Sequence, residues 1–256
     1  MNKKYILLLL VSITVFMSCS KKQTSPKKKE LLIYCGTTMI KPIMEIKKII
    51  EKENDCTILV TKGGSGNLLK SLKINNIGDL YFPGSDSYIK QCEKEKLISD
   101  TAFVGYNKIA IMVQKGNPKN ISSDLNNFKR KDLAVVIGNP ESGSIGKETQ
   151  RVLIKKGIYK EVIKNAYLLT TDSKKLFQVL KDKKADIVMN WYSAAFVENH
   201  KKYLTVLKID DKFVRKKKLV IGLLKTSKYP EIAKRFMEYA QSPAGKDIFR
   251  KYGFGK

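Results

Sequence analysis

The sequence predicts an α/β protein of two lobes, each with a mainly parallel sheet flanked by helices, and a ligand cleft between the lobes. Strand-like apolar runs alternate with runs of helical periodicity from about residue 31 onward. This alternation is typical of parallel sheets whose strands are joined by crossover helices. The pattern restarts near residue 107, and polar, glycine-containing turns follow strands in both halves. Ligands of such sheets bind at the carboxyl ends of the strands, so these turns mark the predicted cleft.

The first half alternates three strands with three helices. Strands are expected at 31–35, 57–61 and 79–82, and helices at 40–53, from Asn67 onward, and at 88–95. The first helix has isoleucines at helical spacing, and Pro42 suits its first turn. A single long strand over 103–113 is expected to lead into the second half.

The second half repeats this design. Its expected strands are 133–137, 167–169 and 185–189, its expected helices are 147–156 and 174–180, and a strand at 219–224 and a helix at 229–240 end the chain. We therefore assign residues 31–106 and 215–256 to lobe 1 and residues 107–214 to lobe 2. The strands near 106–113 and 216–224 would form the hinge.

The N-terminus predicts export. Two lysines precede an apolar run over 5–17, which is too short for a comfortable membrane span but suits a signal peptide, assigned to 1–18. A small residue followed by Cys19 is similar to a bacterial lipoprotein cleavage site, so Cys19 is the expected lipidation site. The polar segment 19–30 would then be a flexible tether to the membrane. An ordinary secretory signal with an incidental cysteine is the alternative.

The distribution of charge argues against a nucleic-acid-binding protein, and the cysteine content argues against a zinc-binding protein. The net charge of +26 could indicate nucleic-acid binding, but the lysines are spread over the whole chain and export separates the protein from nucleic acid. Cys35, Cys56 and Cys92 remain after Cys19, so at most one disulfide can form, and buried thiols are expected at Cys35 and Cys56. Their spacing and the lone His200 give no zinc pattern, and no metal site or cofactor is predicted.

A glycine turn in the first half indicates an anion site. The stretch at 62–67 runs Lys-Gly-Gly-Ser-Gly-Asn after a strand and before a helix. The N–H groups that open a helix have no intrahelical partner, glycines let a ligand approach them, and Ser65 adds a hydroxyl. A second Gly-Ser stretch ends at Ser85, a helix length downstream. Taken alone, either stretch could be an ordinary turn.

Five stretches in unbroken order show a resemblance to a known family. They are Tyr-Cys-Gly-Thr-Thr-Met-Ile-Lys-Pro at 34–42, Gly-Gly-Ser-Gly-Asn-Leu at 63–68, Asp-Leu-Tyr-Phe-Pro-Gly-Ser at 79–85, Gly-Asn-Pro at 138–140, and the ending at 242–254. Over about 31–254 the chain resembles the substrate-binding lipoproteins of molybdate and tungstate ABC importers. These belong to the periplasmic-binding-protein superfamily, and the resemblance implies its type II fold.

The resemblance implies a tetrahedral oxyanion, molybdate or tungstate, held between the lobes by neutral donors. It implies a monomer, lipid-anchored on the outer side of a bacterial membrane, that delivers the anion to an ABC importer permease. The donors, carried over by position, are Thr38 with Thr37, Ser65 with Gly66, backbone N–H groups near Ser144 and Ile145, Ser173, Asn190 and Tyr192.

Asn190 departs from the family pattern, which places Tyr or Glu there. Its amide can still donate to an oxyanion, but it cannot supply a carboxylate to an octahedral metal shell, which would then need Glu141 or Asp172 as a substitute. Tyr192 could supply a phenol instead, or it could pack the hinge together with Trp191. The identity of the anion is therefore left open.

Fewer residues of the sequence support the other functions than support oxyanion binding. The same fold could bind ferric iron, another oxyanion or an organic acid, but clustered tyrosines and a cleft arginine are missing from the pattern. An enzyme is disfavoured because His200 is the only histidine and no nucleophile motif accompanies it. A surface adhesin would not need two anion-binding turns.

Overall fold

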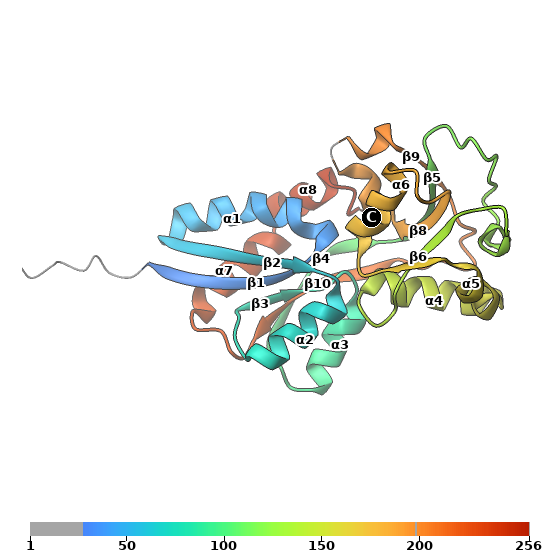
Figure 1. Cartoon of the computed structure of the whole chain (residues 1–256). Coiled ribbons are helices and arrows are strands. Elements are labelled where there is room, and N and C mark those ends of the chain that lie inside the picture. Colours follow the sequence, from blue (N-terminus) through green and yellow to red (C-terminus); the bar gives the residue numbers. More distant parts are fainter. Residues whose placement is uncertain (1–27, 198, 256) are drawn as a thin grey trace, which may run out of the picture.

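The computed structural model describes residues 28–197 and 199–255. The predicted signal peptide and Cys19 lie outside the described residues. Figure 1 shows two lobes side by side, lobe 1 at the left and lobe 2 at the right, each built on its own five-stranded sheet. The predicted α/β, two-lobed class is confirmed. Within the described residues, no helix is long and apolar enough to cross a membrane.

Lobe 1 is built on a sheet with strand order β2-β1-β3-β10-β4. Strands β1, β2 and β3 run parallel, and β10 pairs antiparallel with β3 and β4, so four strands point one way and only β10 runs against them. β3 and the interior of β1 are apolar because helices cover both faces of the sheet there, whereas the edge strand β2 is partly exposed. The bounds are β1 Lys29–Gly36, β2 Cys56–Gly63, β3 Leu80–Phe82, β4 Ile98–Asn107 and β10 Lys217–Leu224.

Lobe 2 repeats this plan with the order β7-β6-β8-β5-β9. Strands β6, β7 and β8 are parallel, and β5 pairs antiparallel with β8 and β9, so again one strand runs against the other four. The bounds are β5 Ile109–Gln114, β6 Val135–Gly138, β7 Leu168–Thr170, β8 Ile187–Trp191 and β9 Leu204–Leu207.

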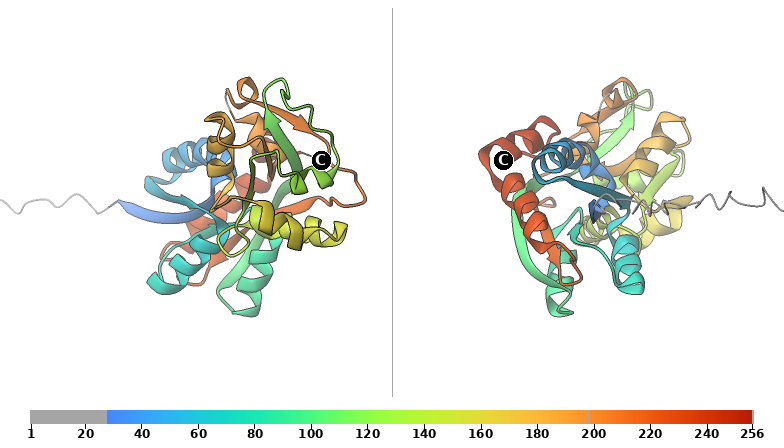
Figure 2. Two further views of the ribbon diagram at one scale, coloured as in Figure 1. Left: turned by 45° about the vertical axis from the view of Figure 1, so that its right-hand side comes forward. Right: turned by 90° about the vertical axis from the view of Figure 1, so that its left-hand side faces the viewer.

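Helices cover the sheets and form the cores. On lobe 1, α1, α7 and α8 pack on one face of the sheet, and α2 and α3 pack on the other (Figures 1 and 2). In lobe 2, α4, α5 and α6 enclose a single core that includes Phe128 and Trp191. The bounds are α1 Ile40–Asn54, α2 Ser65–Asn75, α3 Asp86–Lys94, α4 Ser144–Lys156, α5 Tyr159–Asn165, α6 Ser173–Lys181, α7 Pro230–Gln241 and α8 Pro243–Lys251.

The single strand expected over 103–113 is two strands in two different sheets. β4 ends at Asn107 and β5 begins at Ile109, and the Asn107 side chain accepts a hydrogen bond from Lys108 N at 2.9 Å. The side chain thus takes a backbone donor at the break between the sheets. Strand-forming residues continue without a turn signal from the end of β4 into the buried β5, so the sequence pattern hides the break.

Apart from the short 3-10 helices, two α-helices and one strand were not predicted. The helix at 229–240 was expected to end the chain, but α8 follows, with Ser242 as its N-cap accepting from Gly245 N at 3.1 Å. The other two, α5 and β9, are short and only partly buried, so their periodicity is weak.

The chain returns from lobe 2 to lobe 1 through residues 208–216, which are fastened to α4. Arg151 Nη2 donates to Phe213 O at 2.8 Å, and Lys155 Nζ donates to Lys212 O. Lys156 Nζ lies 5.5 Å from the centre of the Phe213 ring, within the range of a cation–π contact. Helix α4 therefore holds the return crossover at Lys212 and Phe213.

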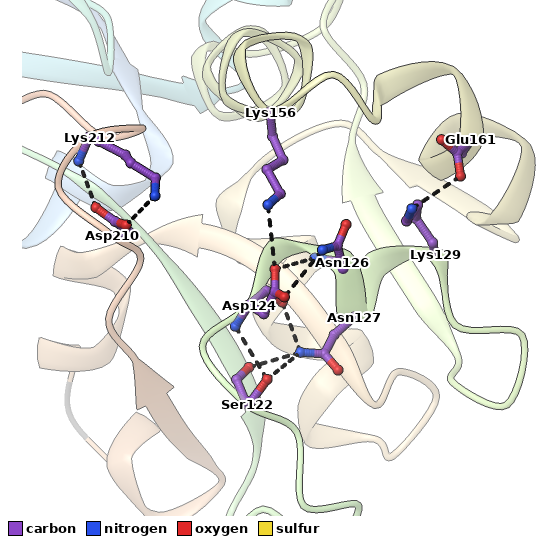
Figure 3. A network of polar contacts seen from close by, with 9 residues as sticks. All are labelled: Ser122, Asp124, Asn126, Asn127, Lys129, Lys156, Glu161, Asp210 and Lys212. Atoms are coloured by element: carbon purple, nitrogen blue, oxygen red, sulfur yellow. Dashed lines mark hydrogen bonds and ion pairs between the residues drawn. The ribbon is translucent and has the colours of Figure 1, made fainter.

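The same end of α4 supports the long connection between β5 and β6 (Figure 3). Asp124 caps the short 3-10 helix η2, Leu125–Lys129, and lies 3.9 Å from Lys156 Nζ. Lys129 pairs with Glu161 of α5 at 3.4 Å. These contacts hold a long loop against the outer side of lobe 2, away from the sheet ends that face lobe 1.

The three described cysteines are free and buried, which confirms the buried thiols predicted at Cys35 and Cys56. Burial raises the pKa of the Cys92 thiol to about 12 and raises that of Cys35 further. These thiols are therefore protonated at neutral pH and act as small apolar core groups.

Candidate functional site

The carboxyl ends of strands from both lobes meet between the lobes. In lobe 1, β1 leads into the 3-10 helix η1, Thr37–Met39, and β2 leads into α2. In lobe 2, β6 leads through a glycine-containing loop into α4, and β7 leads into α6. Strands of both sheets thus direct the starts of helices toward one point, as predicted for the glycine turns.

The helices that begin here carry backbone donors without intrahelical acceptors. The N-caps of α2 and α4 are Gly64 and Gly143, which have no capping side chain. Intrahelical bonds begin only at Leu68 N in α2 and at Lys147 N in α4. The earlier N–H groups are left for other acceptors, and the helix dipoles make this region positive.

Helix α6 differs because it has an acidic N-cap. The Asp172 carboxylate accepts from Lys174 N and Lys175 N at 2.8 and 3.1 Å. The Asp172 carboxylate is thus occupied by hydrogen bonds within its own helix. The backbone N–H of Ser173, the first residue of α6, is not among the donors that it caps.

A small cavity lies where these helix starts converge. Its volume is about 10 Å³, roughly the space of one water molecule. Neither lysine nor arginine lines it among the described residues, so its polar groups are hydroxyls, backbone N–H groups and the capped Asp172. The lining residues are Gly36, Thr37, Thr38, Gly63, Gly64, Ser65, Gly84, Gly143, Ser144, Ile145, Asp172, Ser173 and Trp191.

Ser65 occupies the centre of this arrangement. Its Oγ accepts from Gly84 N at 3.0 Å and donates to Ser144 Oγ of the other lobe at 3.3 Å. Its carbonyl accepts from Tyr81 OH at 2.7 Å, which fixes the start of α2 on the sheet. In the second Gly-Ser stretch, the Gly84 N–H thus donates to the Ser65 hydroxyl at the site, whereas Ser85 caps α3.

The lobes approach each other by backbone at two glycines. A Cβ on Gly64 would collide with the carbonyl oxygens of Ser142 and Thr171, and a Cβ on Gly66 would lie 2.5 Å from Glu141 O. All three oxygens belong to lobe 2. Asn67 N also donates to Ser142 O at 3.2 Å. Gly66 therefore contributes to the contact between the lobes, although it is not among the residues that line the cavity.

Asn190 holds the start of α6 instead of lining the cavity. This fully buried side chain accepts from Ser173 Oγ at 2.5 Å and from Trp191 N at 2.8 Å. Its Nδ2 donates to Ser173 O at 3.0 Å. The structure thus gives this amide a positioning role on Ser173, which sequence reasoning did not foresee.

We expect Asn190→Ala to weaken oxyanion binding about tenfold and to lower the free energy of unfolding by about 1–3 kcal/mol, because it leaves the buried Ser173 groups without partners. Calorimetric titration with molybdate and urea unfolding measure the two effects. Tyr192→Phe is the control and should keep the affinity within about twofold. Unchanged affinity in Asn190→Ala would contradict the positioning role.

Tyr192 lies at the hinge and not at the cavity. Its N–H donates to Lys108 O at 2.8 Å, and Lys108 Nζ lies 5.2 Å from the centre of its ring. The ring lines two other hollows beside the crossover at residue 108. The packing alternative for Tyr192 is the one that agrees with this geometry.

Trp191 lines the cavity, although sequence reasoning placed it only at the hinge. It is 1% exposed, and its Nε1 lies beside Gly84. The indole N–H is a hydrogen-bond donor only, so it suits an anion. All five residues of β8 are buried, so the sequence offers no alternation of burial by which to choose between Trp191 and Tyr192.

Comparison with known proteins identifies the family. The model for "Bacterial extracellular solute-binding protein" matches residues 31–255. The chain therefore belongs to the bacterial extracellular solute-binding proteins.

The most informative relatives are binding proteins of transporters. A Bacillus subtilis protein, YvgL, named as a candidate ABC transporter substrate-binding lipoprotein, is 28% identical, with 99% of each chain covered. The periplasmic molybdate-binding protein of Azotobacter vinelandii has a TM-score of 0.76 at 11% identity, with 88% of this chain and 99% of that chain covered. The substrate-binding domain of a candidate molybdenum ABC transporter from Clostridium difficile has a TM-score of 0.63 at 22% identity, with 90% and 99% covered.

Other solved structures with the same fold bind different ligands. Their titles name a sulfate-binding protein, a thiamin-binding protein and a complex of PEB3 with L-phospholactate, with TM-scores of 0.76, 0.74 and 0.69. The fold is thus shared by receptors for several small molecules, and the ligand must be argued from the site itself.

Proposed function

We propose that the protein captures a tetrahedral oxyanion, molybdate or tungstate, outside the cytoplasm and delivers it to the permease of an ABC importer. It would act as a monomer anchored to the membrane through lipid on Cys19, and as a receptor rather than an enzyme. The anion would be held by Thr37, Thr38, Ser65, Ser144, Ile145, Ser173 and the Trp191 N–H, with Gly66 and Asn190 shaping the site.

The observation that carries this proposal is the donor set of the cavity. Helix starts from both lobes present N–H groups and hydroxyls to one point, and no side-chain cation lines the cavity among the described residues. A desolvated dianion fits such a shell because each hydrogen bond to it is charge-assisted. A ligand held from both lobes would also favour the arrangement in which the lobes touch, which is what a permease could recognise.

A thermal-shift panel with molybdate, tungstate, sulfate, phosphate, chromate and iron(III) citrate tests the proposal. A ligand that binds only the folded chain raises the melting temperature, by an amount that grows with its concentration over Kd. We expect a shift of several degrees with molybdate or tungstate and a much smaller one with sulfate and phosphate. A shift with iron(III) citrate alone, or with none of the anions, would contradict the proposal.

A further inference from the structure

The contact between the lobes extends beyond the cavity to Tyr88 of α3 and Lys147 of α4. Tyr88 belongs to lobe 1, where its ring packs in a core that includes leucines of α2. Lys147 belongs to lobe 2, and its Nζ lies 4.0 Å from the centre of the Tyr88 ring. Neither residue is among those that line the cavity. The pair therefore joins the two lobes beside the cavity without forming part of its wall.

The Tyr88 hydroxyl is buried and has no hydrogen-bond partner among the described residues. The residue is 2% exposed. A Cβ on Gly66 would lie 3.0 Å from Tyr88 OH and 2.5 Å from Glu141 O, so the hydroxyl lies close to the point where the backbones of the lobes meet. Burial raises the pKa of Tyr88, so at neutral pH the hydroxyl keeps a proton that needs an acceptor.

Separation of the lobes would return this hydroxyl to water. Glu141 and Lys147, the neighbours of Tyr88 from lobe 2, would move away with their lobe and leave the hydroxyl accessible to water as an acceptor. A buried polar group without a partner raises the free energy, whereas a hydrated one does not. The Tyr88 hydroxyl therefore opposes the arrangement in which the lobes touch.

The Lys147 ammonium acts in the opposite direction. A cation over the face of a tyrosine ring is attracted by the ring, and 4.0 Å is well within the range of this interaction. The contact requires α3 and α4 to be close, so it favours the arrangement in which the lobes touch. Lys147 remains exposed to solvent, which keeps this stabilisation modest.

We propose that Tyr88 is a positioning residue that favours separated lobes in the absence of ligand, because closure buries its hydroxyl, and that Lys147 partly offsets this effect. The apparent affinity for a ligand held between the lobes equals its intrinsic affinity multiplied by the population of free protein that is closed. Tyr88 would thus lower affinity without touching the ligand. The use of an oxyanion as the ligand rests on the proposed function, whereas the effect on the lobes concerns the chain alone.

Tyr88→Phe removes the hydroxyl and keeps the ring. We expect it to tighten molybdate binding about tenfold, which corresponds to about 1.4 kcal/mol. Calorimetric titration of the full chain measures this effect. The melting temperature without ligand should stay within about 2 °C, because the hydroxyl is hydrated when the lobes are apart. A purely structural role of the hydroxyl predicts unchanged or weaker binding instead.

Tyr81→Phe is the matched comparison and should have the opposite effect. Tyr81 is also buried, but its hydroxyl has a partner: it donates to Ser65 O at 2.7 Å. Removal of this hydrogen bond frees the start of α2, so molybdate binding should weaken about threefold or more. A gain of affinity in both variants would mean that loss of a tyrosine hydroxyl in lobe 1 acts in some other way, and would overturn the role of Tyr88.

Two variants of Lys147 test the other half of the pair. Lys147→Gln removes the cation from the Tyr88 ring and should weaken molybdate binding about threefold. Lys147→Arg keeps a cation that can lie over the ring, so its affinity should stay within about twofold of wild type. Equal affinities of Lys147→Gln and wild type would contradict the contribution of this contact.

Quenching of Trp191 emission by acrylamide, without any ligand, measures the effect on the lobes directly. Trp191 is the only tryptophan of the chain, lines the cavity and is 1% exposed where the lobes touch. Separated lobes would admit the quencher. We therefore expect a lower quenching constant in Tyr88→Phe than in wild type, and a constant in Lys147→Gln that is no lower than in wild type.

The ligand-free measurement separates this inference from the proposed function. If quenching falls in Tyr88→Phe and molybdate binds to no variant, the inference holds and the proposed function fails. If molybdate binds to wild type but binds no more tightly to Tyr88→Phe, the inference is wrong and the proposed function stands. Quenching in Tyr88→Phe equal to that in wild type would overturn the inference whatever the affinities.

Discussion

Replacing Gly64 by alanine is expected to weaken oxyanion binding at least 100-fold, or about 2.8 kcal/mol. The added methyl group would collide with the carbonyl oxygens of Ser142 and Thr171, which are backbone atoms of the opposite lobe and cannot rotate away. Gly64 has φ −69° and ψ 139°, a conformation that alanine adopts without strain. The substitution should therefore prevent the lobes from meeting while leaving each lobe folded.

Calorimetric titration with molybdate and thermal unfolding without ligand measure the two parts of this prediction. Gly63→Ala is the matched comparison, because its Cβ would meet only the Leu68 side chain at 3.4 Å, an ordinary contact. We expect a much smaller loss of affinity there, and nearly unchanged melting temperatures without ligand in both variants. Binding as tight as wild type in Gly64→Ala would show that the ligand does not need the lobes in this arrangement.

Replacing Glu148 by alanine should lower the free energy of unfolding by about 3 kcal/mol, because it leaves two partly buried cations without their carboxylate. Glu148 is 3% exposed. Its Oε1 accepts from Arg151 Nε and Nη2 at 2.9 and 2.6 Å, and its Oε2 lies 2.9 Å from Lys217 Nζ at the start of β10. For a chain of this size the melting temperature should fall by about 6–12 °C.

Asp211→Ala provides the matched control for Glu148→Ala. Asp211 pairs with Lys208 at 2.9 Å, but both side chains are more than 70% exposed, so its loss should cost less than about 1 kcal/mol. Equal effects of the two substitutions would mean that burial of the Glu148 pair is unimportant. Because α4 begins at the cavity and also contacts Lys212, Phe213 and Lys217, Glu148→Ala should in addition weaken ligand binding.

Patterns of periodicity predicted most of the fold. Helical spacing of isoleucines located α1 to within one residue of its end, and short apolar runs located the parallel strands of both sheets. Patterning could not show that 103–113 crosses from one sheet to the other, because strand-forming residues continue across the break, where the Asn107 side chain accepts from Lys108 N. β9 has only four residues, and three of them are half-buried, so its sequence shows no clear alternation of apolar and polar residues.

The site was predictable where it is made by turns and unpredictable where it depends on packing. Turns after strands pointed to Thr37, Thr38 and Ser65, and the family resemblance pointed to Ser144 and Ser173. The structure brings these five residues together. Whether Asn190 faces the cavity or holds Ser173, and whether Trp191 or Tyr192 turns inward, depends on side-chain orientation at the end of β8. Position along the chain gives no information on that choice.

The most direct test of oxyanion binding in the cavity is a fluorescence titration with molybdate. Trp191 is the only tryptophan of the chain and lines the cavity, so its emission reports on this site alone. We predict a saturable change that fits one site per chain and is lost in Gly64→Ala. Heat of molybdate binding with no change in Trp191 emission would place the anion elsewhere, and the absence of both signals would contradict the proposed function.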